Sequence, residues 1–143
     1  MVNDIMLDIE SIFFKVKDKT ILNDISFKVK SGDMVSIIGP NGSGKTTLLK
    51  SISNEISITD GKIIFFKKNI LDFDLNDFAN KKAVLSQSNN LVFPFSVIDI
   101  VKMGRFPIVS KGSQIEEYNL CKKILDIFDL KEYVDQNYIT LSG

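Results

Sequence analysis

The sequence contains a single cysteine and no excess of charge of either sign. Because Cys121 has no second cysteine to pair with, an internal disulfide is excluded. Eighteen basic residues balance eighteen acidic ones, so the chain as a whole attracts neither nucleic acid nor an anionic membrane surface. We therefore expect no nucleic-acid partner, and any other partner must be recognised by a local feature.

A secretory leader and a long apolar run are also missing. The first ten residues, MVNDIMLDIE, carry acidic side chains where a signal peptide would have a basic region followed by an apolar one. Apolar stretches such as Met34–Ile38 are far shorter than the roughly 20 residues that a membrane helix needs. With the lone cysteine, these absences predict a cytoplasmic protein that works from outside the lipid if it works at a membrane.

What is present is the composition of one soluble globular domain, with 44% hydrophobic and 25% charged residues over 143 positions.

The first part of the sequence has the patterns expected of β-strands. Residues 5–16 and 20–33 alternate apolar with polar positions, which predicts two antiparallel strands of a half-buried sheet. Residues 34–39, MVSIIG, form a continuous apolar run, as expected of a parallel strand covered on both faces. Residues 46–53 then change to helical spacing.

Residues 61–66 and 82–87 predict two more strands, and the pattern becomes helical from about Phe95. Ser96 and Asp99 are spaced to cap a helix that ends at Gly104. Ser113 and Glu116 have the same capping-box spacing ahead of a second helix.

Two smaller features have structural interpretations. Cys121 lies on the same helical pattern as Leu120, Ile124 and Leu125, so it is interpreted as a core residue. The short charge clusters at residues 17–19 and 67–68 are interpreted as solvated turns.

The run GPNGSGKTT, between the apolar stretch and the first helix, fits the phosphate-binding pattern G-x-x-x-x-G-K-[ST]. A chance match in a chain of this length is on the order of one in two hundred. Glycines let a phosphate chain approach the backbone closely, and the helix that follows adds a positive field. Lys45 is expected to reach the β- and γ-phosphate oxygens, and the Thr46 hydroxyl to bind Mg²⁺. The predicted nucleotide-binding residues are Gly39, Pro40, Asn41, Gly42, Ser43, Gly44, Lys45, Thr46 and Thr47.

A phosphate loop alone leaves GTPases, kinases, helicases and transporter motors open. The order ILNDISFKVKSGDMVSIIGPNGSGKTTLLKSI, GKI, VLSQ and TLSG resembles the ATP-binding subunit of ABC transporters. The resemblance runs from Ile5 to Gly143 and covers about the first half of a usual family member. It implies an α/β P-loop NTPase fold of the ABC type, with an N-terminal antiparallel β-subdomain, a partial parallel core and a helical subdomain. The implied parts of this partial domain, residues 1–143, are about 1–92 and about 93–140.

The resemblance also implies roles for residues outside the loop. Gln87 matches the family glutamine that reaches Mg²⁺ and the attacking water, so Gln87 and Lys45 are the implied catalytic residues. The base-stacking aromatic of the family falls on Val16 without a gap, and Phe14 takes its place if the turn is shorter. Core packing is the alternative interpretation of Phe14. The start of the family's signature motif, LSGGQ or LSGGE, matches Leu141, Ser142 and Gly143, where the motif is broken off.

The stretch after Gln87 bears on the cargo. LSQSNNLVFPFSVIDIVKMGRFP is similar to the haem-import branch of the family, through Phe93, Pro94, Phe95, Ser96, Val97, Val101, Gly104, Arg105 and Pro107. Siderophore and cobalamin importers share much of this region and remain the alternatives. The resemblance implies an ATP-binding subunit on the inner face of the cell membrane, docked on permease subunits through roughly Phe93–Tyr138 and paired with a second ATP-binding subunit. The same stretch argues against a non-transport ABC protein.

Other family features have no counterpart in the sequence: the Walker B strand with its Asp and catalytic Glu, and the switch histidine, since histidine is absent altogether. We therefore expect the 143 residues to bind ATP and Mg²⁺ without hydrolysing ATP at a family-like rate. A non-catalytic nucleotide-binding remnant is the alternative from another class. We also expect poor solubility, because Val35, Ile37 and Ile38 would face an unpaired sheet edge.

Overall fold

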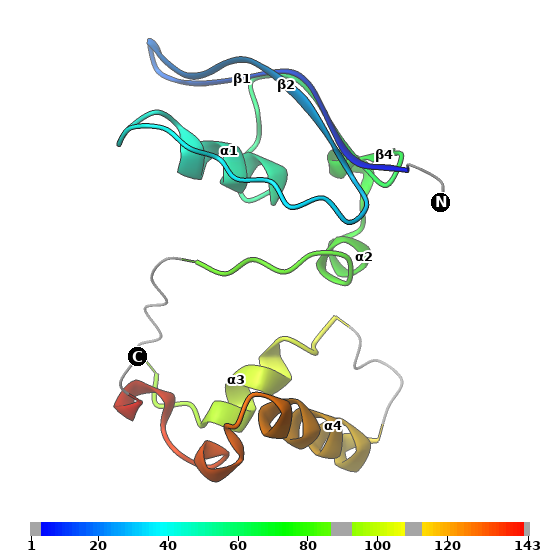
Figure 1. Cartoon of the computed structure of the whole chain (residues 1–143), viewed down its shortest axis with the longest axis vertical. Helices are drawn as coiled ribbons and strands as arrows, with labels where there is room; N and C mark the ends of the chain where they lie inside the picture. The colour runs from blue at the N-terminus through cyan, green and yellow to red at the C-terminus, as the bar shows by residue number, and fades with distance from the viewer. Residues whose placement is uncertain (1–3, 87–92, 108–112, 142–143) are drawn as a thin grey trace. The chain divides into compact units, whose positions relative to one another are not determined.

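A four-stranded antiparallel sheet and four α-helices make up most of the regular secondary structure in the computed structural model, which describes residues 4–86, 93–107 and 113–141 (Figure 1). The chain divides into two units, Met1–Phe78 and Ala79–Gly143. Among the described helices, none is both long enough and apolar enough to cross a membrane.

The sheet of the first unit has the order β2-β1-β3-β4, and each neighbouring pair is antiparallel. Its bounds are β1 Ile5–Val16, β2 Lys19–Lys30, β3 Asp60–Phe65 and β4 Lys68–Asn69. The two strands predicted from alternation over residues 5–16 and 20–33 are confirmed, and so is the strand predicted near residue 61. One face of the sheet is buried by Leu7, Ile9, Ile12, Leu22, Val29 and Ile63.

Helix α1, Lys45–Ile52, packs against this core through Leu48, which is buried, and Ile52, which is partly buried. A short helical turn, η1 Ile70–Asp72, and helix α2, Leu75–Ala79, complete the cluster with Ile70 and Phe78. The helix predicted over residues 46–53 is thus confirmed. Its apolar side chains lie on one side of the helix, next to the sheet.

Two predicted strands are absent from the described part of the chain. Residues 33–40 and 82–86 have no strand pairing, although Ile37 packs partly against the core. Met34, Ile38 and Leu85 are 97%, 93% and 92% exposed. A strand needs a neighbouring strand whose backbone N–H and C=O groups pair with its own. The described strands pair only with one another, in the antiparallel sheet. The prediction of a buried parallel strand at 34–39 is therefore wrong for this structure. Gln87, at the end of the second segment, lies outside the described residues.

The second unit is helical, with α3 Val97–Met103, α4 Gln114–Ile127 and two short turns, η3 Lys131–Tyr133 and η4 Tyr138–Thr140. Both predicted capping boxes are present, Ser96 with Asp99 and Ser113 with Glu116. Cys121 is fully buried between these helices, as predicted, and burial raises the pKa of its thiol. The rest of this core is Val97, Ile98, Leu125 and Val134.

Candidate phosphate-binding site

The loop before α1 owes its shape to its glycines. Gly42 and Gly44 have φ angles of 80° and 92°, in the left-handed region that favours glycine. A Cβ on Gly44 would also lie 3.0 Å from the Ile21 carbonyl oxygen and 3.1 Å from Leu22 Cδ2. Gly44 is therefore required both by the positive φ of the turn and by the close approach of the loop to β2. The sequence pattern did not indicate the contact with β2.

Helix α1 begins directly after this turn with unpaired backbone donors. Gly44 offers no side-chain cap, and the Leu48 amide makes the first helical hydrogen bond to the Gly44 carbonyl at 2.8 Å. The amides of residues 45–47 thus have no acceptor within the helix. Because the first turn also has no acidic residue, the positive end of the helix is not neutralised locally. This geometry suits an anion.

Lys45 folds back over the loop that precedes it. Its ammonium group donates hydrogen bonds to the carbonyl oxygens of Gly39 and Pro40, both at 2.8 Å. The Ser43 amide donates to the Pro40 carbonyl at 3.3 Å, which closes the turn. The charge of Lys45 is thus held against the backbone of the loop, where phosphate oxygens would compete with the two carbonyls for it.

The residues present fit a nucleotide with Mg²⁺. Thr46 is exposed on the first turn of α1, where its hydroxyl is available to a metal. The described residues contain no group of three acidic, cysteine or histidine side chains able to hold a metal ion by themselves. Mg²⁺ usually binds through one or two protein oxygens together with substrate phosphates, so Thr46 would share the ion with the nucleotide. The bound metal would neutralise phosphate charge.

The chain is similar to known proteins of one family. The model of the family described as ABC transporter matches residues 22–143. The chain belongs to the ABC transporter family. The matched range includes the whole phosphate loop of residues 39–47.

Curated ABC relatives include the hemin import ATP-binding proteins HmuV of Hahella chejuensis, with 35% identity over 88% of this chain, and of Pseudoalteromonas translucida, with 31% over 96%. The matched regions are 48% and 53% of those proteins, so the chain spans about half their length.

Two solved structures have the same fold. A nucleotide-free ATP-binding cassette has a TM-score of 0.79 at 24% identity, covering 98% of this chain and 60% of the other. A dimeric cassette bound to ADP and phosphate has 0.80 at 23%, covering 96% and 64%.

Not every residue implied by the ABC resemblance lies in the described part of the chain. Gln87, Ser142 and Gly143 are outside it, so their roles remain predictions. Leu141 is partly buried and packs against the core of the helical unit, and its amide donates to the Tyr138 carbonyl at 3.2 Å.

Phe14, the residue suggested for base stacking, is partly buried and packs against the sheet core. It lies opposite Leu22 on β2, and Leu22 in turn approaches Gly44. Leu22 thus lies between Phe14 and the phosphate loop. Val16 is exposed and is the last residue of β1. Contact of Phe14 with a base remains a prediction.

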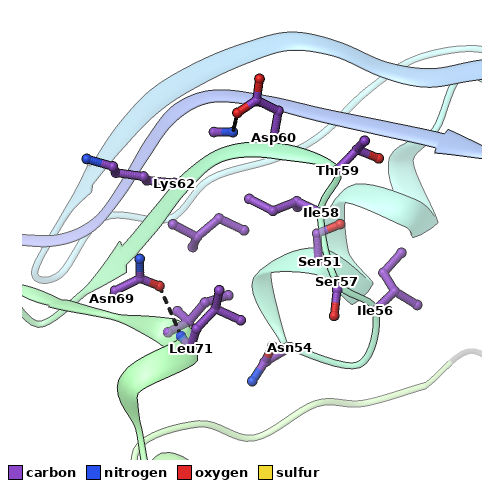
Figure 2. Close-up of a pocket in the computed structure, with 13 residues that line it drawn as sticks. Ser51, Asn54, Ile56, Ser57, Ile58, Thr59, Asp60, Lys62, Asn69 and Leu71 are labelled. Carbon is purple, nitrogen blue, oxygen red and sulfur yellow. Dashed lines mark hydrogen bonds between the residues drawn. The ribbon is translucent and has the colours of Figure 1, made fainter.

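A cavity of about 260 Å³ lies at the other end of α1, between that helix, β3 and η1 (Figure 2). Ser51 and Asn54 line it from the helix side. Two of its polar side chains are occupied locally, since Asn69 Oδ1 accepts from the Leu71 amide at 3.0 Å and Asp60 Oδ1 from the Gly61 amide at 2.7 Å. This cavity is separated from the loop by an eight-residue helix, roughly 12 Å long, and we do not assign the nucleotide to it.

Proposed function

We propose that this chain supplies the ATP-binding loop of an ABC importer subunit, which couples ATP binding and hydrolysis to uptake of haem or a related iron complex. The observation that carries the proposal is the loop of residues 39–47, with Lys45 inside it and the free amides of α1 behind it. The names of the curated relatives support haem as the cargo. A siderophore or cobalamin is the alternative cargo.

The proposed partners are membrane permease subunits, reached through the helical unit, and a second ATP-binding subunit. The helical unit has apolar side chains to offer, because Phe106 and Ile115 are 73% and 72% exposed. Together with Lys102, Arg105, Gln114, Glu117 and Tyr118 they line a groove of about 560 Å³. An exposed apolar groove with a charged rim suits a protein partner. The proposed location is the inner face of the cell membrane.

We also propose that the 143 residues by themselves bind ATP without hydrolysing it at a family-like rate. The first turn of α1 has no carboxylate, and the sequence has no histidine to act as a general base. Lys45 and Thr46 position phosphate and metal, but neither activates the attacking water. Hydrolysis at several turnovers per second by the purified chain would contradict this part of the proposal.

The cargo is tested by disrupting the gene and measuring uptake of three labelled compounds: haem, a ferric siderophore and cobalamin. The proposal expects haem uptake to fall to background and the other two to persist. The wild-type gene should restore haem uptake, a gene with Lys50→Ala should restore it equally, and a gene with Lys45→Ala should not. Lys50 is the matched control because it is exposed in the last turn of the same helix. Unchanged haem uptake with loss of siderophore or cobalamin uptake would reassign the cargo.

A further inference from the structure

Three lysines surround the turn between β1 and β2: Lys15, Lys17 and Lys19, here called the tip lysines. All three are exposed, and none forms an ion pair with any other residue that the structure describes. The turn contains one carboxylate, Asp18. The tip therefore has a surplus of two positive charges that a simple solvated turn does not require.

We propose that the tip lysines attract the polyphosphate of an incoming nucleotide and guide it to the loop of residues 39–47. The inference rests on the proposed ATP binding and adds a group of residues that speeds association without contacting the reacting atoms. A nucleoside triphosphate carries several negative charges, and a local surplus of opposite charge raises its rate of encounter with the site.

The position of the turn supports this role. The Ile21 carbonyl lies 3.0 Å from the place of a Cβ on Gly44, so β2 contacts the phosphate loop directly. Lys19 is two residues along the strand from Ile21, about 7 Å at the usual rise of a strand. Val16 pairs with Lys19 and Lys15 with Thr20, which keeps Lys15 beside them. In Figure 1 the tip of the β1–β2 hairpin and the loop before α1 lie at the same end of the unit.

This separation is short enough for unpaired charges to act together. The Debye length is about 10 Å at 0.1 M salt, which exceeds the distance of about 7 Å along the strand from Lys19 to the point where β2 contacts the loop. The first turn of α1 has no acidic side chain to oppose the field. Lys45 is held against the Gly39 and Pro40 carbonyls before a nucleotide arrives, so the tip lysines are the freer charges during approach.

The turn between β3 and β4 provides a matched control. Lys67 has a φ of 63° and Lys17 a φ of 52°, so both occupy similar turn conformations. Lys67 forms an exposed ion pair with Asp4 at 3.5 Å, at the opposite end of β1 from Val16. Asp4 directly precedes β1 and Val16 is its last residue, so the two turns lie at opposite ends of a twelve-residue strand. A regular strand of that length spans at most about 40 Å, or a few Debye lengths at 0.1 M salt.

The experiment compares association of a fluorescent ATP analogue with the 143-residue chain by stopped flow at ionic strengths from about 0.02 to 0.5 M. The variants are Lys17→Gln/Lys19→Gln, the control Lys67→Gln/Lys68→Gln, and Asp18→Asn. We expect the first to associate about two to five times more slowly at low salt, with the difference lost at high salt where screening is strong. We expect the control to match the wild type and Asp18→Asn to associate faster, a gain that misfolding cannot produce.

Equal association rates for the wild type and Lys17→Gln/Lys19→Gln at low salt would overturn the inference, and so would an equal loss in the control, which would reflect net charge alone. Either result leaves the proposed ATP binding intact, because the analogue still binds. If the wild-type chain binds no analogue at any salt concentration, the proposed function itself fails and the inference with it. The amplitude of wild-type binding therefore separates the two failures.

Discussion

Lys45 links the shape of the loop to the chemistry proposed for it. Its ammonium group donates to two backbone carbonyls of the same loop, so it is positioned before any nucleotide binds. Replacing it by alanine removes a cation that would form charge-assisted hydrogen bonds to phosphate oxygens, each worth about 1.5–3 kcal/mol. We expect Lys45→Ala to weaken MgATP binding at least about tenfold, measured by isothermal titration calorimetry.

The control for this prediction is Lys50→Ala in the same helix. Lys50 is exposed at the C-terminal end of α1, away from the loop. We expect its dissociation constant for MgATP to stay within about twofold of the wild type, because a single distant surface charge is largely screened. Equal weakening in both variants would mean that Lys45 acts only through the net charge of α1.

A comparison of Gly61 with Gly32 separates two costs of adding a side chain at a positive φ: the unfavourable backbone conformation and the clash with neighbouring atoms. Gly61 has a φ of 94°, and a Cβ there would lie 2.3 Å from the Ser11 carbonyl oxygen. Gly32 has a φ of 87° but nothing within 4 Å. We expect Gly32→Ala to cost about 1–2 kcal/mol of unfolding free energy, from conformation alone. Gly61→Ala adds overpacking against β1, for a total of about 2–5 kcal/mol. Urea unfolding of both variants measures the difference, and equal losses would show that β1 moves aside without cost.

The turn that follows α3 is joined to α4 by an ion pair with two hydrogen bonds. Arg105 Nε donates to Glu117 Oε2 at 3.0 Å and an Arg105 terminal nitrogen to Oε1 at 3.1 Å, with side chains 23% and 17% exposed. The hydrogen bonds from Arg105 lower the pKa of Glu117 below its usual range. The contribution of this pair to stability is therefore fully present above the usual glutamate pKa, about 4.3, and is lost as the pH falls through the lower pKa of the folded protein.

We expect the unfolding free energy of the wild type to fall more steeply than that of Glu117→Gln between about pH 4.5 and pH 2.5. Urea unfolding followed by circular dichroism at several pH values measures both slopes. Glu132→Gln is the control, since Glu132 is exposed on η3 and forms no ion pair within the described residues. Identical slopes in all three proteins would show that Arg105 and Glu117 do not titrate as a pair.

The same two helices show why some elements were predictable from the sequence. Ser96 and Ser113 each have an acidic residue three positions later, and a capping box is completed within one turn of chain. The strands predicted at 34–39 and 82–87 depend instead on distant partners, which an apolar run does not identify. The antiparallel hairpin of β1 and β2 was predictable because its partner follows after a two-residue turn.

Some features of the candidate site were likewise predictable from the sequence, and others were not. The loop of residues 39–47 could be found because its nine residues are consecutive and each has a local reason to be there. The contact of Gly44 with Ile21 and the proximity of the tip lysines depend on how α1 packs against β2, which no short motif encodes. Gln87, Ser142 and Gly143 lie outside the described residues, so their roles remain predictions.

Within the described part of the chain, the segment of residues 33–40 exposes several apolar side chains. Met34 and Ile38 are almost fully exposed, and the backbone of residues 33–40 has no strand partner within the described sheet. Exposed apolar side chains on an extended, unpaired backbone promote association between copies of a chain. We therefore expect the isolated 143 residues to self-associate, which agrees with the poor solubility predicted from the sequence.

We expect Ile38→Lys to raise the concentration of monomer severalfold, measured by sedimentation velocity, because the new charge opposes pairing of residues 33–40 between chains. Ile127→Lys is the matched control. Ile127 is also largely exposed, but its backbone belongs to α4 and has no free strand edge. Adding the same charge there should change the monomer concentration little, if pairing of extended backbone drives association. An equal improvement from both variants would instead assign the association to general surface hydrophobicity, and a wild type that stays monomeric and unfolds in one sharp transition would contradict the prediction altogether.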